Sequence, residues 1–261
     1  MSVVLIERAA HGVAHVVMNR PEVFNAFDES MIEQLDAAFK ELNADPKVRI
    51  IVLRGHGKHF SAGADLQWMQ RAAAADQAWN VADARRFANM LARIESSPKP
   101  TVAQVQGVAL GGGVGLVCAC DMAVAAEHAS FAVSEAKFGI LPAVIGPYVV
   151  NAVGKRHAKR LALTTSRIGA NEALQMGLVQ QVVPLEQLQS TTEQWCQDLI
   201  VGGPQAQNEI KQLFAQLPQA PITPEVRELT AQTIARVRCG TEAKEGFEAF
   251  LSKRPPSWMA S

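Results

Sequence analysis

The distribution of predicted strands along the chain constrains the fold most. Short apolar or β-branched runs predict strands only in the first part of the sequence, over residues 3–7, 13–18, 50–53, 101–105, 122–125, 131–133 and 179–183. From about Leu185 onward the periodicity is helical throughout, over residues 185–200, 204–216, 223–238 and 241–252. We therefore expect an α/β body over residues 1–195 and a helical segment over residues 196–261.

The helices of the predicted body have recognisable boundaries. His11-Gly12 separates the first two strands and indicates a hairpin. Asp28 is expected to cap a helix that ends at Asp45-Pro46. Further helices are expected over residues 79–95 and 113–119, with an interruption near the alanine run 72–75, and short helices over 147–177. The first helix should bury one face, made of Met31, Ile32, Leu35, Ala38, Phe39 and Leu42.

Composition excludes some classes of function. Lys plus Arg and Asp plus Glu both number 25, which argues against a nucleic-acid partner bound by bulk charge, although a few lysines could still hold a small anion. The four cysteines lack zinc-site spacing, so no metal site is expected. The N-terminal residues contain charges and no long apolar run, which predicts a cytoplasmic protein without a membrane segment.

Two loops carry the chemical signal. "FSAGAD" (60–65) and "ALGGG" (109–113) each join a strand end, glycines and a helix start. The first N–H groups of a helix have no partner within the helix and carry partial positive charge. Glycine allows a ligand to approach the backbone closely. Such loops can hold a phosphate or the oxygen of a reacting carbonyl group.

One glycine loop alone would leave alternatives open. Glycines before a helix often serve packing, and the phosphate-loop pattern GxxxxGK[ST] is absent from the sequence. "GGGVG" could also pass for a loose dinucleotide-binding loop, because Glu135 follows at about 20 positions.

Several motifs in a fixed order resemble one family. "KHFSAGADL", "VQGVALGGGVGLVCACDMAVA" and "FAVSEAKFGILPA" are preceded by "NRPEVFNAF" and followed by "RIGANEALQMGLVQQVVP". This set resembles the enoyl-CoA hydratase/isomerase (crotonase) family over nearly the whole chain. The resemblance implies an α/β ClpP-like spiral of ββα units with a C-terminal helical trimerisation segment, forming a homotrimer or a dimer of trimers. It also implies an acyl-CoA substrate, so that coenzyme A belongs to the substrate and no separate cofactor is needed.

The same resemblance implies roles for individual residues. The backbone N–H groups of Ala64 and Gly112 would form an oxyanion hole for the thioester oxygen, where negative charge develops during reaction. The usual basic residue of the early loop is here the acidic Glu22. Contacts with coenzyme A or the acyl group would come from Val23, Phe24, Ala62, Asp65, Leu66, Gly111 and Gly115, and from Phe250 and Lys253 of the C-terminal helix, often across a subunit boundary.

The carboxylates depart from the pattern of the best-known hydratases of the family. These carry two glutamates, but this chain has only the one at Glu135, with Gly115 at the position of the other. Glu135 alone would then serve as acid and base. It could hydrate a double bond by itself, it could move a proton as a Δ3–Δ2 enoyl-CoA isomerase, or the substrate could supply the missing group.

A finer resemblance concerns the substrate. "GGGVGL" with "SEAKFGILPAVIGPYVV" looks like bacterial hydratases of branched glutaconyl-CoA thioesters, namely 3-methylglutaconyl-CoA of leucine breakdown and γ-carboxygeranoyl-CoA of acyclic terpene breakdown. Their free carboxylate would need a donor or cation, for which Lys137, Tyr148 and His157 are nearby in sequence. Gly115 would leave room for this acyl group. We therefore expect an enoyl-CoA hydratase of this type, with the isomerase or a non-catalytic binder of coenzyme A esters or of a partner as alternatives.

Overall fold

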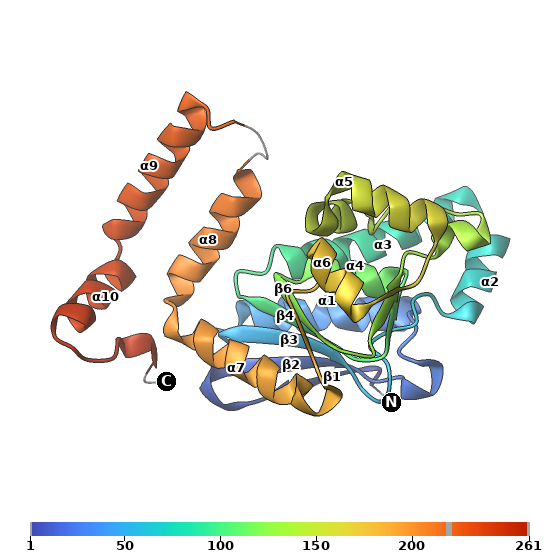
Figure 1. Ribbon diagram of the computed structural model, residues 1–261, viewed down its shortest axis with the longest axis horizontal. Coiled ribbons are helices and arrows are strands. Elements are labelled where there is room, and N and C mark those ends of the chain that lie inside the picture. Colours follow the sequence, from blue (N-terminus) through green and yellow to red (C-terminus); the bar gives the residue numbers. More distant parts are fainter. Residues whose placement is uncertain (1, 218–220, 260–261) are drawn as a thin grey trace.

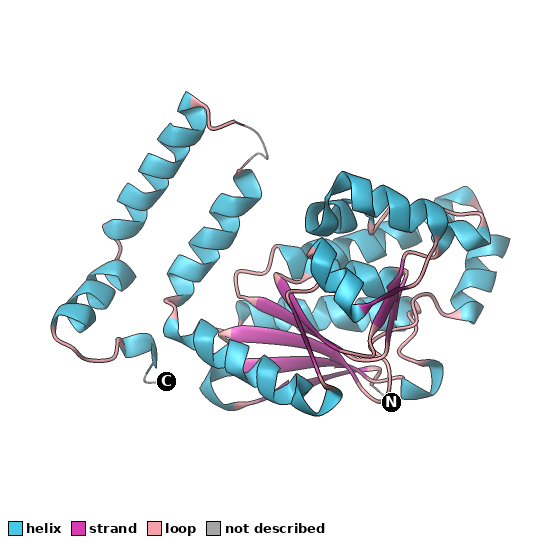
Figure 2. Cartoon of the chain, in the orientation of Figure 1, coloured by secondary structure: helices cyan, strands magenta, loops and turns pink. Residues whose placement is uncertain are grey.

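The main sheet has six strands in the order β1-β2-β3-β4-β6-β9. The computed structural model describes residues 2–217 and 221–259. β1 and β2 are antiparallel and form the predicted hairpin, whereas the remaining neighbours are parallel (Figures 1 and 2). The strands are β1 (Val4–Arg8), β2 (Val13–Met18), β3 (Ile50–Gly55), β4 (Thr101–Val105), β6 (Met122–Ala126) and β9 (Gln181–Val183).

A second, three-stranded sheet lies beside the first. It contains β5 (Val108–Leu110), β7 (Ser130–Ala132) and β8 (Ile168–Gly169), in the order β5-β7-β8. The sequence did not predict β5 or β8. Both are three residues long or shorter, and their partners lie far away in the sequence, so periodicity carries little information about them.

The central strands are buried on both faces. Ile51 and Leu53 of β3 pack into the main core, while Ile50 and Val52 point to the opposite face. There they meet α7 (Leu188–Val201) through Cys196 and Ile200. Burial on both faces explains why the parallel strands are continuously apolar rather than alternating.

The helices on the core side begin at the predicted caps. Asp28 accepts a hydrogen bond from the Met31 N–H at 2.8 Å and starts α1 (Glu29–Ala44), which buries the whole predicted apolar face. The predicted interruption after the alanine run separates α2 (Leu66–Ala74) from α3 (Gln77–Glu95), and α4 (Gly112–Ala119) follows the triple glycine.

The segment 147–177 contains the predicted short helices and one strand that was not predicted. Helix α5 (Gly146–Thr164) consists of two shorter helices that meet at a kink, and β8 and α6 (Ala170–Met176) follow it. The kink lies at Gly154, where φ is +74°, a conformation that only glycine adopts without strain. Short 3₁₀ segments complete the structure: Ala10–Gly12, Pro21–Val23, Glu135–Phe138, Leu185–Gln187 and Ser257–Met259.

The last three helices, α8 (Pro204–Gln216), α9 (Pro224–Arg238) and α10 (Thr241–Leu251), extend away from the sheet (Figure 1). The predicted division between 1–195 and 196–261 falls inside α7, which packs on the sheet, so the extension begins at α8. The α/β body and the helical C-terminal segment are confirmed. No helix in the described ranges is long and apolar enough to cross a membrane.

Candidate active site

A cavity of about 620 Å³ lies between α2, α3 and the segment that precedes α5. Its walls are mostly apolar, as in typical small-molecule sites. The three predicted catalytic residues, Ala64, Gly112 and Glu135, all line it. The remaining lining residues are Phe27, Trp68, Met69, Ala72, Ala73, Asn80, Asp83, Ala84, Phe87, Phe138, Ile140, Leu141, Pro142, Ala143, Val144 and Ile145.

The first glycine loop turns the Ala64 N–H away from its neighbouring strand. Phe27 donates to the Gly63 carbonyl oxygen at 2.7 Å and accepts from the Asp65 N–H at 2.8 Å. These two bonds flank Ala64 in a parallel bridge, and in such a bridge the residue between them points its own N–H to the other side. Ala64 itself is exposed and lines the cavity, so its N–H is available to a ligand.

The second glycine loop supplies Gly112 as the first residue of α4. The Gly111 N–H is used by the Ala132 carbonyl oxygen, whereas the Gly112 N–H has no backbone partner in the described ranges. Gly111 has φ +49°, and a Cβ on Gly112 would lie 2.5 Å from Cε2 of Phe27. The turn and the close contact therefore both require glycine. The loops are tied together, because Ser61 hydrogen-bonds to Val108 and Leu110.

Glu135 begins the 3₁₀ segment after β7, and its carboxyl group lies against the triple glycine. A Cβ on Gly111 would be 3.3 Å from Glu135 Oε1. Oε2 is buried and has no hydrogen-bond partner among the described residues. Burial raises the pKa of Glu135, and the N–H groups of Glu135 and Ser134 oppose the shift only in part. A carboxyl group with a raised pKa and a free oxygen is suited to general acid–base catalysis.

The cavity contains a second carboxylate that sequence reasoning missed. Asp83 of α3 is only 5 % exposed and accepts hydrogen bonds from Trp68 Nε1 at 3.1 Å and Arg86 Nη2 at 2.8 Å. Asn80, Asp83, Ala84 and Phe87 follow helical spacing and all line the cavity. The sequence signal that could have identified Asp83 is an acidic residue on the apolar, inward face of the predicted helix 79–95.

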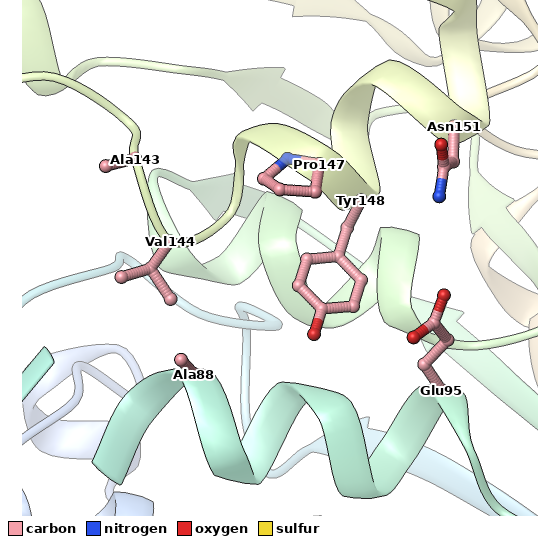
Figure 3. Close-up of a pocket in the computed structure, with 7 residues that line it drawn as sticks. All are labelled: Ala88, Glu95, Ala143, Val144, Pro147, Tyr148 and Asn151. Carbon is pink, nitrogen blue, oxygen red and sulfur yellow. The ribbon is translucent and has the colours of Figure 1, made fainter. Parts of the chain in front are cut away.

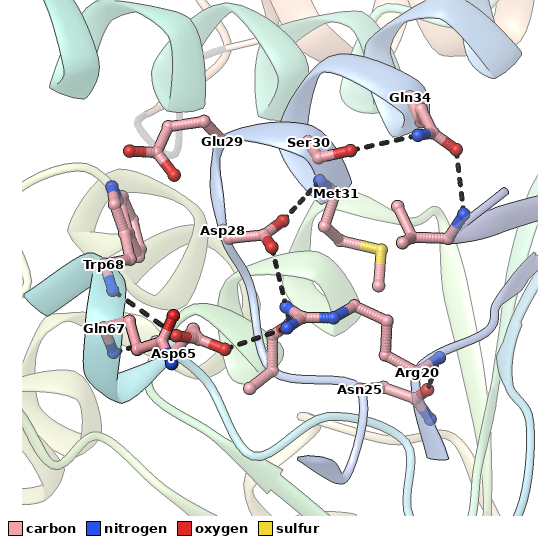
Figure 4. A network of polar contacts seen from close by, with 12 residues as sticks. Arg20, Asn25, Asp28, Glu29, Ser30, Met31, Gln34, Asp65, Gln67 and Trp68 are labelled. Carbon is pink, nitrogen blue, oxygen red and sulfur yellow. Dashed lines mark hydrogen bonds and ion pairs between the residues drawn. The ribbon is translucent and has the colours of Figure 1, made fainter. Parts of the chain in front are cut away.

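One guanidinium joins the starts of α1 and α2. Arg20 Nη1 lies 3.0 Å from Asp28 Oδ2, and Nη2 lies 3.0 Å from Asp65 Oδ2 (Figure 4). Asp65 also accepts from the N–H groups of Gln67 and Trp68 at the start of α2. Burial alone would raise the pKa of Asp65, but these donors and Arg20 lower it below its ordinary value. The Asp65 side chain is thus engaged in holding the loop that presents Ala64.

The other predicted substrate contacts fall into two groups. Val23, Phe24 and Ala62 lie together at the first loop, since the Ala62 N–H donates to the Phe24 carbonyl oxygen at 2.9 Å. Phe24 and Leu66 are exposed apolar side chains beside this loop. Phe250 and Lys253, by contrast, lie at the end of α10 in the extension and do not line the cavity of the same chain (Figure 1).

Gly115 does not provide the predicted open space. A Cβ on Gly115 would lie 2.3 Å from Cγ2 of Ile145, whose buried side chain fills the position. Gly115 is buried inside α4 and is not part of the cavity wall. The three residues considered as partners for a substrate carboxylate do not line this cavity either. Lys137 and His157 are exposed outside it, and Tyr148 lines a neighbouring cavity.

Comparison with known proteins agrees with this geometry. The family model described as enoyl-CoA hydratase/isomerase matches residues 8–261. The chain is 37 % identical over 244 residues to a Thermus thermophilus protein named as an enoyl-CoA hydratase, covering 94 % of this chain and 96 % of that protein. Enoyl-CoA hydratases are hydro-lyases.

Solved structures agree over nearly the full length. An enoyl-CoA hydratase from Shewanella pealeana superposes with a TM-score of 0.95 at 38 % identity, covering 98 % of this chain and 96 % of that one. AtuE of Pseudomonas aeruginosa superposes with a TM-score of 0.92 at 36 % identity, covering 98 % and 99 %. The chain belongs to the enoyl-CoA hydratase/isomerase (crotonase) family of enzymes.

Proposed function

We propose that the protein adds water across the 2,3 double bond of an acyl-CoA thioester. One observation carries the proposal: Ala64, Gly112 and Glu135 line one apolar cavity, and the carboxyl oxygen Oε2 of Glu135 has no hydrogen-bond partner among the described residues. The proposal needs no cofactor, because coenzyme A is part of the substrate.

The geometry suits a mechanism with one carboxylate. Ala64 and Gly112 donate to the thioester oxygen, and ionised Glu135 takes a proton from water while the hydroxide adds to C3. Negative charge moves to the thioester oxygen, where the two N–H groups stabilise it. The Glu135 carboxyl group then returns a proton to C2 on the same face, so that water is added in full and Glu135 is ionised again.

The branched glutaconyl thioesters remain a finer candidate, supported by the sequence resemblance. Their free carboxylate would share the cavity with Glu135 and with Asp83, of which only Asp83 is paired with a cation, Arg86, and no Lys, Arg or His belongs to the lining within the described ranges. Buried like charges repel strongly, since little solvent screens them. The cavity lining therefore favours an uncharged 2-enoyl-CoA as the better substrate.

A substrate panel tests the proposal. Crotonyl-, 3-hexenoyl- and 3-methylglutaconyl-CoA are offered, and enoyl absorbance is followed. We expect crotonyl-CoA to lose its absorbance, with a kcat about 10²–10⁴-fold lower in Glu135→Gln. Glu135 must be ionised to act as base, so kcat/KM should fall as the pH is lowered through its pKa, which burial raises above the ordinary value.

The alternatives predict other outcomes of the same panel. An isomerase would only shift 3-hexenoyl-CoA, and a pure binder would bind thioesters without turning any over. Undiminished hydration by Glu135→Gln would show that the mechanism is wrong even if the reaction is right.

A further inference from the structure

A second cavity of about 430 Å³ lies between α3 and α5 (Figure 3). Of the residues that line it, the sequence singled out only Tyr148, as a candidate partner for a substrate carboxylate. Apolar side chains form most of its wall, and polar groups gather at one end. It is lined by Ala88, Glu95, Ala143, Val144, Pro147, Tyr148 and Asn151.

This cavity adjoins the active-site cavity. Ala143 and Val144 line both of them. Along α3, Ala84 lines the first cavity, and Ala88, one turn further on, lines the second. Figure 3 shows Val144 opposite Ala88 across the gap between α3 and the segment before α5. The two cavities therefore share the part of the wall formed by Ala143 and Val144, and both lie along α3.

The far end of the second cavity is polar. The Tyr148 hydroxyl and the Asn151 amide make no side-chain hydrogen bond with other described residues, and Glu95 stands beside them (Figure 3). Burial, followed by the nearby Glu95 carboxylate, raises the pKa of Tyr148, so the hydroxyl stays protonated and can donate. These groups offer donors and acceptors to an uncharged oxygen, whereas Glu95 would repel a carboxylate.

We propose that the cavity between α3 and α5 binds the distal end of a long acyl chain, and that it prefers a chain with an uncharged hydroxyl or carbonyl end over one with a carboxylate end. The proposal rests on the function proposed above and names the substrate class of the same site.

Blocking the second cavity tests the path of the chain. Ala88→Phe should fill it, and Ala82→Phe, at an exposed alanine of α3 that lines neither cavity, is the matched control. We expect the ratio of kcat/KM for 2-decenoyl-CoA to that for crotonyl-CoA to fall about tenfold or more in Ala88→Phe and to stay at the wild-type value in Ala82→Phe. An unchanged ratio in Ala88→Phe would overturn the proposal.

The binding of decanoyl-CoA, measured by calorimetry, separates the two proposals. If the wild-type protein hydrates no thioester, the proposed function fails, but weaker decanoyl-CoA binding by Ala88→Phe than by Ala82→Phe still supports the second cavity. Equal binding by both variants counts against it. Circular dichroism and thermal melting confirm that each variant is folded.

The polar end has its own test. Wild-type protein should prefer 10-hydroxy-2-decenoyl-CoA over the thioester that ends in a carboxylate, and Tyr148→Phe should reduce the preference for the hydroxyl-ended chain over plain 2-decenoyl-CoA. A preference for the carboxylate-ended chain, or no change in Tyr148→Phe, would refute the assignment of this end.

Discussion

At the scale of single residues, Gly115 illustrates how a missing side chain can be misread. From the sequence it looks like an empty place in the active site. In the structure Ile145, which is distant in sequence, occupies that place, and the segment carrying Ile145 also forms the cavity wall. The absence of a glutamate at position 115 is thus matched by an apolar side chain, and Glu135 is left as the proposed acid or base beside the two glycine loops.

This packing gives a stability prediction. Gly115→Glu should destabilise the protein by about 3 kcal/mol or more, because it overpacks α4 against Ile145 and buries a charge. Ile145→Ala should cost about 2–5 kcal/mol by leaving a void. The double variant should be clearly more stable than the sum of the two effects predicts, since each change relieves the other. Chemical denaturation measures all three, and strict additivity would contradict the contact.

The sequence predicted which motif residues gather at the candidate site better than it predicted the walls of the site. Ala64, Gly112 and Glu135 belong to local motifs, and the structure places all three on one cavity. Asp83 and Ile145 take their roles from contacts between segments far apart in the chain. No local pattern encodes such contacts, so these two residues became visible only in the structure.

At the scale of elements, the position of the oxyanion loop depends on how two helix starts are joined. Arg20 binds the capping carboxylates of α1 and α2, Asp28 and Asp65, and also donates to the Ala26 carbonyl oxygen at 2.9 Å. Asp65 directly follows Ala64. Arg20 is therefore a positioning residue, which acts on the reaction through the loop rather than by touching substrate.

Arg20→Lys should lower kcat more than it raises KM. Lysine keeps the charge but lacks the planar fork that reaches both carboxylates, so Ala64 loses its fixed position. We expect kcat to fall about tenfold or more, since small misplacements of reacting groups are costly. Arg93→Lys is the matched control, because Arg93 pairs with Asp36 between α3 and α1, away from the cavity. If both variants lose thermal stability but neither loses kcat, the positioning role is refuted.

Elements with strong local signals were predicted well. The apolar face of α1 and its Asp28 cap follow directly from helical spacing and capping chemistry. The very short strands β5 and β8, by contrast, owe their existence to pairing with β7. Tertiary contacts decide such elements, which explains why sequence patterns failed there.

At the scale of the whole molecule, polar contacts join the helices of the C-terminal extension, but many of their apolar side chains are exposed. Arg236 pairs with Glu209 between α9 and α8, and Glu242 accepts hydrogen bonds from the first N–H groups of α8. The extension nevertheless exposes large apolar side chains: Ile210, Phe214, Ile222, Ile234, Phe247, Phe250 and Leu251. Exposed apolar groups gathered on one segment are typical of an association surface. This supports association of the extension with another surface, and the homotrimer or dimer of trimers that the family resemblance implies stays a prediction.

Assembly should also complete the substrate site. Phe250 lies near the end of α10 and Lys253 lies just beyond that end, and neither lines the cavity of its own chain, so the predicted contacts with coenzyme A require a neighbouring copy. We expect light scattering to give a mass of a multiple of three times 28.1 kDa. Phe214→Asp on α8, where the side chain is 66 % exposed, should reduce that mass and raise KM for crotonyl-CoA.

The matched control is Leu163→Asp on α5, which changes an equally exposed apolar side chain (74 %) outside the extension and should leave the trimer intact. A reduced mass with unchanged KM in Phe214→Asp would mean that the extension assembles the protein without contributing to substrate binding. A monomeric wild-type protein would contradict both the predicted association and the predicted shared site. The exposed apolar side chains of α8–α10 would then not be covered by another copy, and Phe250 and Lys253 would have no neighbouring cavity to reach.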